Sequence, residues 1–298
     1  MQYISPFSFF PDLVDKSIER KDIILAKRRW LAEFDLLGTS TITINNKEFN
    51  KDELLKLFDN LEKTQNIDFH LLIAKDKELL HFLEHNTVEQ QYKFQYKKED
   101  LEQDFLAWVS PYFSHSFKKA SVDIFKAKNL YLFKALNSLP LYITDDYQYE
   151  IWEPLQNYFQ RFIEQVQELN EQPDSSVNDD KIAQFTNYEL SSLIKELPVE
   201  HFQHQINDYA YEVMRCSISA FNTLKLYEWS LVILDNALML PVNDETREML
   251  QDKKKEMQHI INRMPENGSY DYSSSRSSSS DNVWPILRIV LFVVYVLF

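Results

Sequence analysis

The stretch IWEPLQNYFQRFIEQVQEL, residues 151–169, decides the fold of this chain. Its apolar side chains recur every three or four residues, which is the spacing of one face of an α-helix. The main stripe consists of Ile151, Leu155, Tyr158, Phe162, Val166 and Leu169, with Trp152, Phe159 and Ile163 beside it. A stripe this wide is typical of a helix buried on more than one side. We therefore predict a buried helix over 147–169 and a mainly α-helical protein around it.

Similar periodic patterns lie on both sides of this stretch. They predict helices at 21–37, 68–84, 98–113, 121–137, 181–196, 199–223, 225–240 and 243–263. One segment breaks the helical pattern, because 41–44 alternates threonine and isoleucine and Asn45 and Asn46 then supply turn residues. We expect a small β-hairpin near 41–49, supported by the helices around it.

The segment EQPDSSVNDD, residues 171–180, is polar, acidic and interrupted by proline. This composition predicts a linker between two helical bodies, 1–170 with the hairpin and 181–264.

Glycine usage excludes several classes of enzyme. The 298 residues contain two glycines, Gly38 and Gly268, where average usage would give about twenty. Phosphate-binding loops, dinucleotide fingerprints and nucleophile elbows need glycine where the backbone approaches a ligand closely. P-loop NTPases, Rossmann enzymes, protein kinases and α/β-hydrolases are therefore not expected, and neither is a cofactor.

Charge and cysteine content indicate the compartment and exclude some partners. The net charge is −14, which argues against nucleic acid as a partner and against electrostatic docking on anionic lipid. Cys216 is the single cysteine, so an internal disulfide is excluded, and we expect a small buried side chain in a reducing compartment. The N-terminal MQYISPFSFFPD lacks the basic start and apolar core of a signal peptide.

A helical pair near 211–243 resembles one tetratricopeptide-repeat hairpin. The large and small residues that carry the resemblance are Phe221, Leu224, Tyr227, Ser230, Leu231, Leu234, Ala237, Leu238, Leu240 and Pro241. In that family small residues let two helices approach, and Ser230 and Ala237 occupy those positions of the second helix. The match departs from the family at Ile218, where a small residue would stand, and a second copy near a 34-residue period is not evident. A generic helical hairpin is the alternative.

The C-terminal region has a different composition from the rest of the chain. Residues 265–282 are rich in serine and predict a flexible leash. The membrane segment expected at 283–298 contains Trp284, Arg288, Ile289, Val290, Leu291, Phe292, Val293, Val294, Tyr295, Val296, Leu297 and Phe298. As a helix it would span about 24 Å, shorter than a hydrocarbon core of about 30 Å, with Trp284 at the interface and Arg288 reaching the headgroups. We expect a single-pass C-terminal anchor with the bulk of the chain in the cytoplasm; folding back onto the protein is the alternative.

His81-Phe82-Leu83-Glu84-His85 carries the sharpest catalytic signal. An H-x-x-E-H spacing places two imidazoles one helical turn apart beside a carboxylate that can activate water, and it resembles the zinc motif of inverted-motif metalloproteases. On that alternative His81 and His85 would bind the metal and Glu84 would be catalytic. The interleaved leucine and phenylalanine residues instead indicate an ordinary core helix, and a third ligand is not singled out.

These observations favour a membrane-tethered scaffold or adaptor without catalytic activity, which binds an unidentified protein partner. The alternatives are a membrane-bound zinc metallohydrolase that uses the HFLEH motif and a subunit of a membrane complex. The sequence predicts no metal and no nucleic-acid partner for the scaffold.

Overall fold

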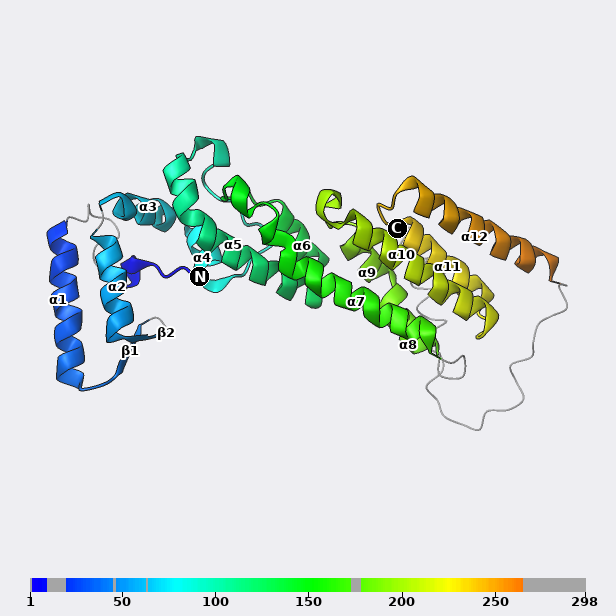
Figure 1. Cartoon of the computed structure of the whole chain (residues 1–298), viewed down its shortest axis with the longest axis horizontal. Coiled ribbons are helices and arrows are strands. Elements are labelled where there is room, and N and C mark those ends of the chain that lie inside the picture. Colours follow the sequence, from blue (N-terminus) through cyan, green and yellow to red (C-terminus); the bar gives the residue numbers. More distant parts are fainter. Residues whose placement is uncertain (1, 10–19, 45–46, 63, 173–177, 265–298) are drawn as a thin grey trace. The chain divides into compact units, whose positions relative to one another are not determined.

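The computed structural model describes residues 2–9, 20–44, 47–62, 64–172 and 178–264, and every structural statement below concerns these residues (Figure 1). It is mainly α-helical with one two-stranded antiparallel sheet, as the sequence predicts. The described residues up to Met257 form one compact unit, and residues 258–263 are the end of the final helix.

The elements follow in chain order. They are η1 (Pro6–Phe9), α1 (Arg20–Leu37), β1 (Thr41–Ile44), β2 (Lys47–Asn50), α2 (Lys51–Leu61), α3 (Thr64–Lys75), α4 (Lys77–His85), η2 (Lys98–Asp100), α5 (Gln103–Lys126), α6 (Leu130–Asn137), η3 (Asp145–Tyr147), η4 (Glu150–Trp152), α7 (Glu153–Glu171), α8 (Asp179–Thr186), α9 (Tyr188–Ile194), α10 (Val199–Asn222), α11 (Tyr227–Leu238) and α12 (Asp244–Arg263).

The predicted hairpin is confirmed and packs on α1 and α2. Strands β1 and β2 pair in the register Ile42↔Phe49, which directs both side chains to the same core. Asn50 ends β2 and caps α2, because its side chain accepts from the Glu53 N–H at 2.9 Å and Glu53 accepts from the Asn50 N–H in return. This reciprocal cap satisfies backbone donors that a helix start leaves unpaired.

The predicted central helix is confirmed as α7, and it contacts both α5 and α10. Leu155, Phe159 and Val166 are fully buried, so the apolar stripe has neighbours on more than one side. The helix begins at Glu153 rather than at 147, because Pro154 suits a first turn and short 3-10 turns precede it.

Four of the predicted helices have the wrong bounds. The single helix expected at 68–84 is two helices, α3 and α4, since Asp76 leaves the helical backbone and caps α4. Residues 98–113 and 121–137 instead form α5 and α6, and α5 runs through Pro111 because its buried serines and phenylalanines continue the packed face. Residues 181–196 form α8 and α9, separated where Asn187 accepts from the Leu190 N–H at 2.8 Å.

Helices α10 and α11 pack as a hairpin at the position of the tetratricopeptide resemblance. Ser230 and Ala237 are fully buried, and Ser217 Oγ donates to the Ser230 carbonyl at 2.8 Å. Ser217 rather than Ile218 therefore supplies the small contact residue of α10. Membership of the repeat family and the division into two bodies both stay predictions. Helices α7 and α10, which lie on opposite sides of the predicted linker in the sequence, contact each other within one compact unit.

Neither the leash at 265–282 nor the membrane segment at 283–298 falls within the described residues. In the part of the chain that the structure describes, no helix is both long and apolar enough to cross a bilayer.

Candidate functional site

The segment that joins α4 to α5 contains a loop that we call the lysine loop, residues 91–99, whose last two residues begin η2. Along 92–97 its side chains alternate: Tyr92, Phe94 and Tyr96 are buried or half-buried, whereas Lys93, Gln95 and Lys97 are exposed. The loop therefore holds an aromatic face against the protein and a cationic face toward solvent.

Acidic side chains at the start of α4 fix the backbone of this loop. Asp76 Oδ1 caps α4 by accepting from the Leu79 N–H at 3.0 Å, and its Oδ2 accepts from the Gln95 N–H at 2.6 Å. Two residues away in the loop, the Lys93 N–H donates to the Glu78 carboxylate. The backbone N–H groups of Lys93 and Gln95 are thus paired with acidic side chains at the start of α4.

Asp76 forms these bonds at an electrostatic cost. Burial raises the pKa of this carboxyl group above its ordinary value, and the donated backbone N–H bonds oppose that rise. Its side chain sits between α4 and the loop, so it holds two elements together at one point.

The aromatic face of the loop is anchored in the core. Phe94 contacts Phe82, Phe113 and Tyr142, with ring centroids 5.9, 6.2 and 5.4 Å apart. The Tyr142 hydroxyl donates to the Tyr96 carbonyl, and burial raises the pKa of Tyr142 so that this donor keeps its proton. The loop is therefore held through its backbone on one side and through its rings on the other.

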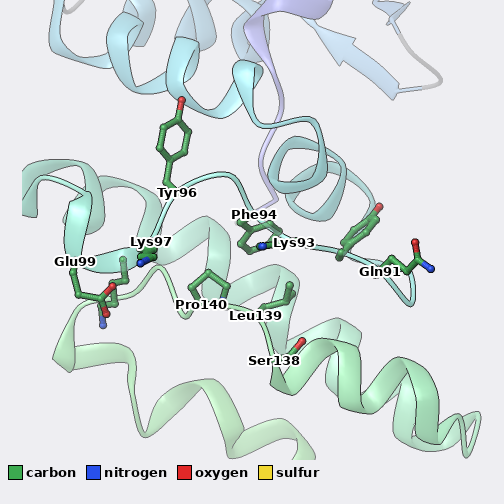
Figure 2. A pocket seen from close by; sticks show the side chains of 11 residues that line it. Gln91, Lys93, Phe94, Tyr96, Lys97, Glu99, Ser138, Leu139 and Pro140 are labelled. Carbon is green, nitrogen blue, oxygen red and sulfur yellow. The ribbon is translucent and has the colours of Figure 1, made fainter.

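A pocket of about 560 Å³ opens between the lysine loop and the turn that follows α6 (Figure 2). Phe94, Leu139 and Pro140 give it apolar walls. Its charged side chains are Lys93, Lys97, Lys98 and Glu99. Three cations against one anion make this pocket locally positive in a protein of net charge −14.

A second pocket of about 350 Å³ adjoins the first, because Lys98 lines both. Its other polar lining residues are Gln103, Thr144, Asp145 and Asp146. The two aspartates are exposed, so the charge of the lining changes sign across Lys98.

The HFLEH residues support this loop and the N-terminal segment. The Tyr92 hydroxyl lies within hydrogen-bond distance of Nδ1 of His81, whose ring centroid is 4.6 Å from that of His85. Burial raises the pKa of Tyr92 to about 12, so its phenol stays protonated at neutral pH. Glu84 instead accepts from the Ser5 N–H at 3.0 Å. The structure thus brings the two histidines together and pairs the carboxylate with another segment.

The zinc alternative needs a third ligand. Within the described residues, no group of three His, Cys, Asp or Glu side chains could hold a metal ion. The proposed metal role of His81 and His85 stays a prediction that has no third ligand in this part of the chain.

The remaining residues singled out in the sequence are Cys216 and the predicted membrane segment. Cys216 is buried as expected, with Sγ 3.3 Å from Asn170 Oδ1, and burial raises its pKa to about 12. A thiol with such a pKa carries little thiolate at neutral pH and is a poor nucleophile. The predicted membrane residues from Trp284 to Phe298 lie outside the described residues.

The lysine loop is the candidate site that the helix-by-helix interpretation of the sequence missed. Its signal is present in the printed sequence as Tyr92-Lys93-Phe94-Gln95-Tyr96-Lys97, an aromatic–polar alternation that is typical of an extended segment with one buried face.

Comparison with models of protein families, with curated proteins and with solved structures found no match to this chain.

Proposed function

We propose that this protein is a non-catalytic interaction scaffold, and that the lysine loop with its two pockets is the surface that contacts a protein partner. The observation that carries this proposal is the combination of an open pocket, a cationic rim and a backbone fixed by Asp76, Glu78 and Tyr142. A surface held in one conformation loses little conformational entropy when a partner binds.

The chemistry of the first pocket favours binding over catalysis. Nucleophilic catalysis needs a hydroxyl or thiol whose proton a neighbouring base can accept. Among the residues that line this pocket, Ser138 carries the aliphatic hydroxyl group. Its Oγ donates to the Ala135 carbonyl at 2.7 Å. A carbonyl oxygen is not a base at neutral pH, so this hydroxyl is not activated.

We further propose that the C-terminal segment ties the scaffold to a membrane, with the bulk of the chain on the cytoplasmic side. This part of the proposal rests on the sequence of residues 283–298, because apolar residues dominate it and a serine-rich leash precedes it. Fractionation of the full-length chain and of a 1–282 truncation, with an alkaline wash of the membranes, tests it. Full-length protein in the soluble fraction would contradict the tether.

Site-specific photocrosslinking tests the scaffold proposal. A photoreactive amino acid placed at Gln91 or Ser138, both exposed on the pocket rim, should crosslink to the same polypeptide in cells. The matched control is the exposed position Glu171 at the end of α7, which should not give that product. Equal crosslinking from all three positions would show that the loop is not the contact surface.

Metal analysis separates the scaffold from the zinc alternative. Full-length protein should contain less than one equivalent of zinc, and His81→Ala should not change that content. Stoichiometric zinc that is lost in His81→Ala would reverse the choice between the two functions.

A further inference from the structure

The charges around the lysine loop are arranged as two neighbouring fields of opposite sign. Lys93, Lys97 and Lys98 line the first pocket, and Asp145 and Asp146 line the second. Among the described residues, none forms an ion pair with the ammonium groups of the three lysines. Both fields are therefore available to a ligand.

The extent of this surface distinguishes between kinds of ligand. A pocket of about 560 Å³ could by itself hold a small anion or metabolite. That ligand would leave the adjoining pocket, and its two carboxylates, without a complementary group. A peptide segment is long enough to lie across both pockets, since an extended chain advances about 3.3 Å per residue.

The apolar walls add a third requirement. Leu139 is buried and Pro140 half-buried where the turn after α6 meets Phe94 of the lysine loop. Figure 2 shows the side chains of Phe94, Leu139 and Pro140 between the loop and this turn. An apolar side chain in this place would remove apolar surface from water at the centre of a charged rim, which is how interface centres are commonly built.

We propose that the two pockets together bind a charge-polarised peptide segment of the partner protein. Its acidic side chains lie at Lys93, Lys97 and Lys98, an apolar residue lies on Leu139 and Pro140, and a basic residue faces Asp145 and Asp146. This inference rests on the proposed scaffold function and specifies the chemistry of its partner.

Selection from a randomised peptide library displayed on phage, against the full-length protein in neutral detergent, tests this inference. Enriched peptides should combine a cluster of Asp or Glu with a neighbouring apolar residue and a Lys or Arg. The affinity of a synthetic enriched peptide, measured by fluorescence anisotropy, should weaken as salt concentration rises, because exposed ion pairs are screened.

Matched charge variants locate the binding surface. The test variant replaces the three pocket lysines: Lys93→Gln, Lys97→Gln and Lys98→Gln. The control, which has the same net charge, replaces three exposed lysines elsewhere: Lys119→Gln, Lys195→Gln and Lys225→Gln. The pocket variant should bind the peptide about tenfold more weakly, the sum expected for several exposed ion pairs, and the control should bind as the wild type does. Equal affinity of both variants would overturn the inference.

A double-mutant cycle examines the second pocket. Asp145→Asn with Asp146→Asn should weaken binding of the enriched peptide, and the same change should have little effect on a peptide whose basic residue is replaced by glutamine. Full competition by millimolar inorganic phosphate, or enrichment without a basic residue, would indicate a simple anion pocket and overturn the peptide inference. Partner crosslinking at Gln91 would in either case still support the scaffold function, so the two failures can be told apart.

Discussion

Acidification should destabilise this protein through one buried histidine, His70 of α3. Its side chain lies against Trp108, with ring centroids 4.7 Å apart, and its Nδ1 is 2.8 Å from the Tyr3 hydroxyl. Burial raises the pKa of Tyr3, so the phenol keeps its proton and can donate it to Nδ1. Burial also lowers the pKa of His70 from 6.5 to about 3, because a charged imidazole would lose its hydration.

The sign of the effect follows from proton binding in the two states. Below pH 6.5 the unfolded chain takes up a proton at this histidine and the folded protein does not, so the free energy of unfolding falls as the pH drops toward 3. Between pH 7 and pH 5 the loss from His70 is about 2 kcal/mol.

Urea unfolding of wild type and His70→Gln at pH 7 and pH 5, followed by tryptophan fluorescence, measures this contribution. Glutamine retains an acceptor for the Tyr3 hydroxyl and does not titrate. The free energy lost between the two pH values should be about 2 kcal/mol smaller in His70→Gln than in wild type. His259→Gln is the matched control, because it removes an exposed histidine of α12 and should show the same pH-linked loss as wild type. The same pH-linked loss in wild type and His70→Gln would refute the assignment of a neutral, buried His70.

Three further predictions concern Asp76, the α10–α11 hairpin and the C-terminal segment 283–298. Asp76→Ala removes the acceptor of two backbone N–H groups and should lower the free energy of unfolding by about 2–4 kcal/mol. The control Asn50→Ala, at an exposed helix cap, should lower it by about 1 kcal/mol. Equal losses in the two variants would contradict the role of Asp76 in holding the loop. Ala237→Trp should lower the free energy of unfolding by about 1–3 kcal/mol or more, because it overpacks the contact between α10 and α11. The control is Ala32→Trp on the exposed side of α1. Wild-type melting of Ala237→Trp would argue against that contact. The 1–282 truncation should be soluble, folded and helical by circular dichroism, and a product found only in aggregates would show that residues 283–298 belong to the core.

The sequence predicted the helical class because apolar periodicity is a local property. The stripe around Leu155 and Phe159 indicated a helix with neighbours on several sides, and α7 has them. The alternation at 41–44 indicated the hairpin for the same reason. Helix boundaries were predicted less well where a tertiary contact decides them, as at Asp76, whose second carboxylate oxygen pairs with the distant Gln95.

The candidate site depended on contacts between residues far apart in the chain. The HFLEH spacing placed His81 and His85 on one helix face. This placement depends only on helical spacing, and in the structure the two rings lie next to each other. The contacts of those residues are not local. The Tyr92 hydroxyl lies next to Nδ1 of His81, and the Glu84 side chain accepts from the N–H of Ser5, which is 79 residues away in the sequence. A motif that suggested zinc chemistry therefore supports a loop and a terminus in the folded protein.

By itself, the sequence determined composition and local pattern: a helical chain with two glycines, a net negative charge, a serine-rich region and an apolar C-terminal segment. These follow from residue type and from spacings of a few residues. Only the tertiary structure decided that Lys93, Lys97 and Lys98 face the turn at Leu139 and Pro140, and that Asp145 and Asp146 line the pocket beside them. Those residues are between 41 and 53 positions apart in the sequence, and packing of Phe94 and Tyr142 in one aromatic core brings their segments together.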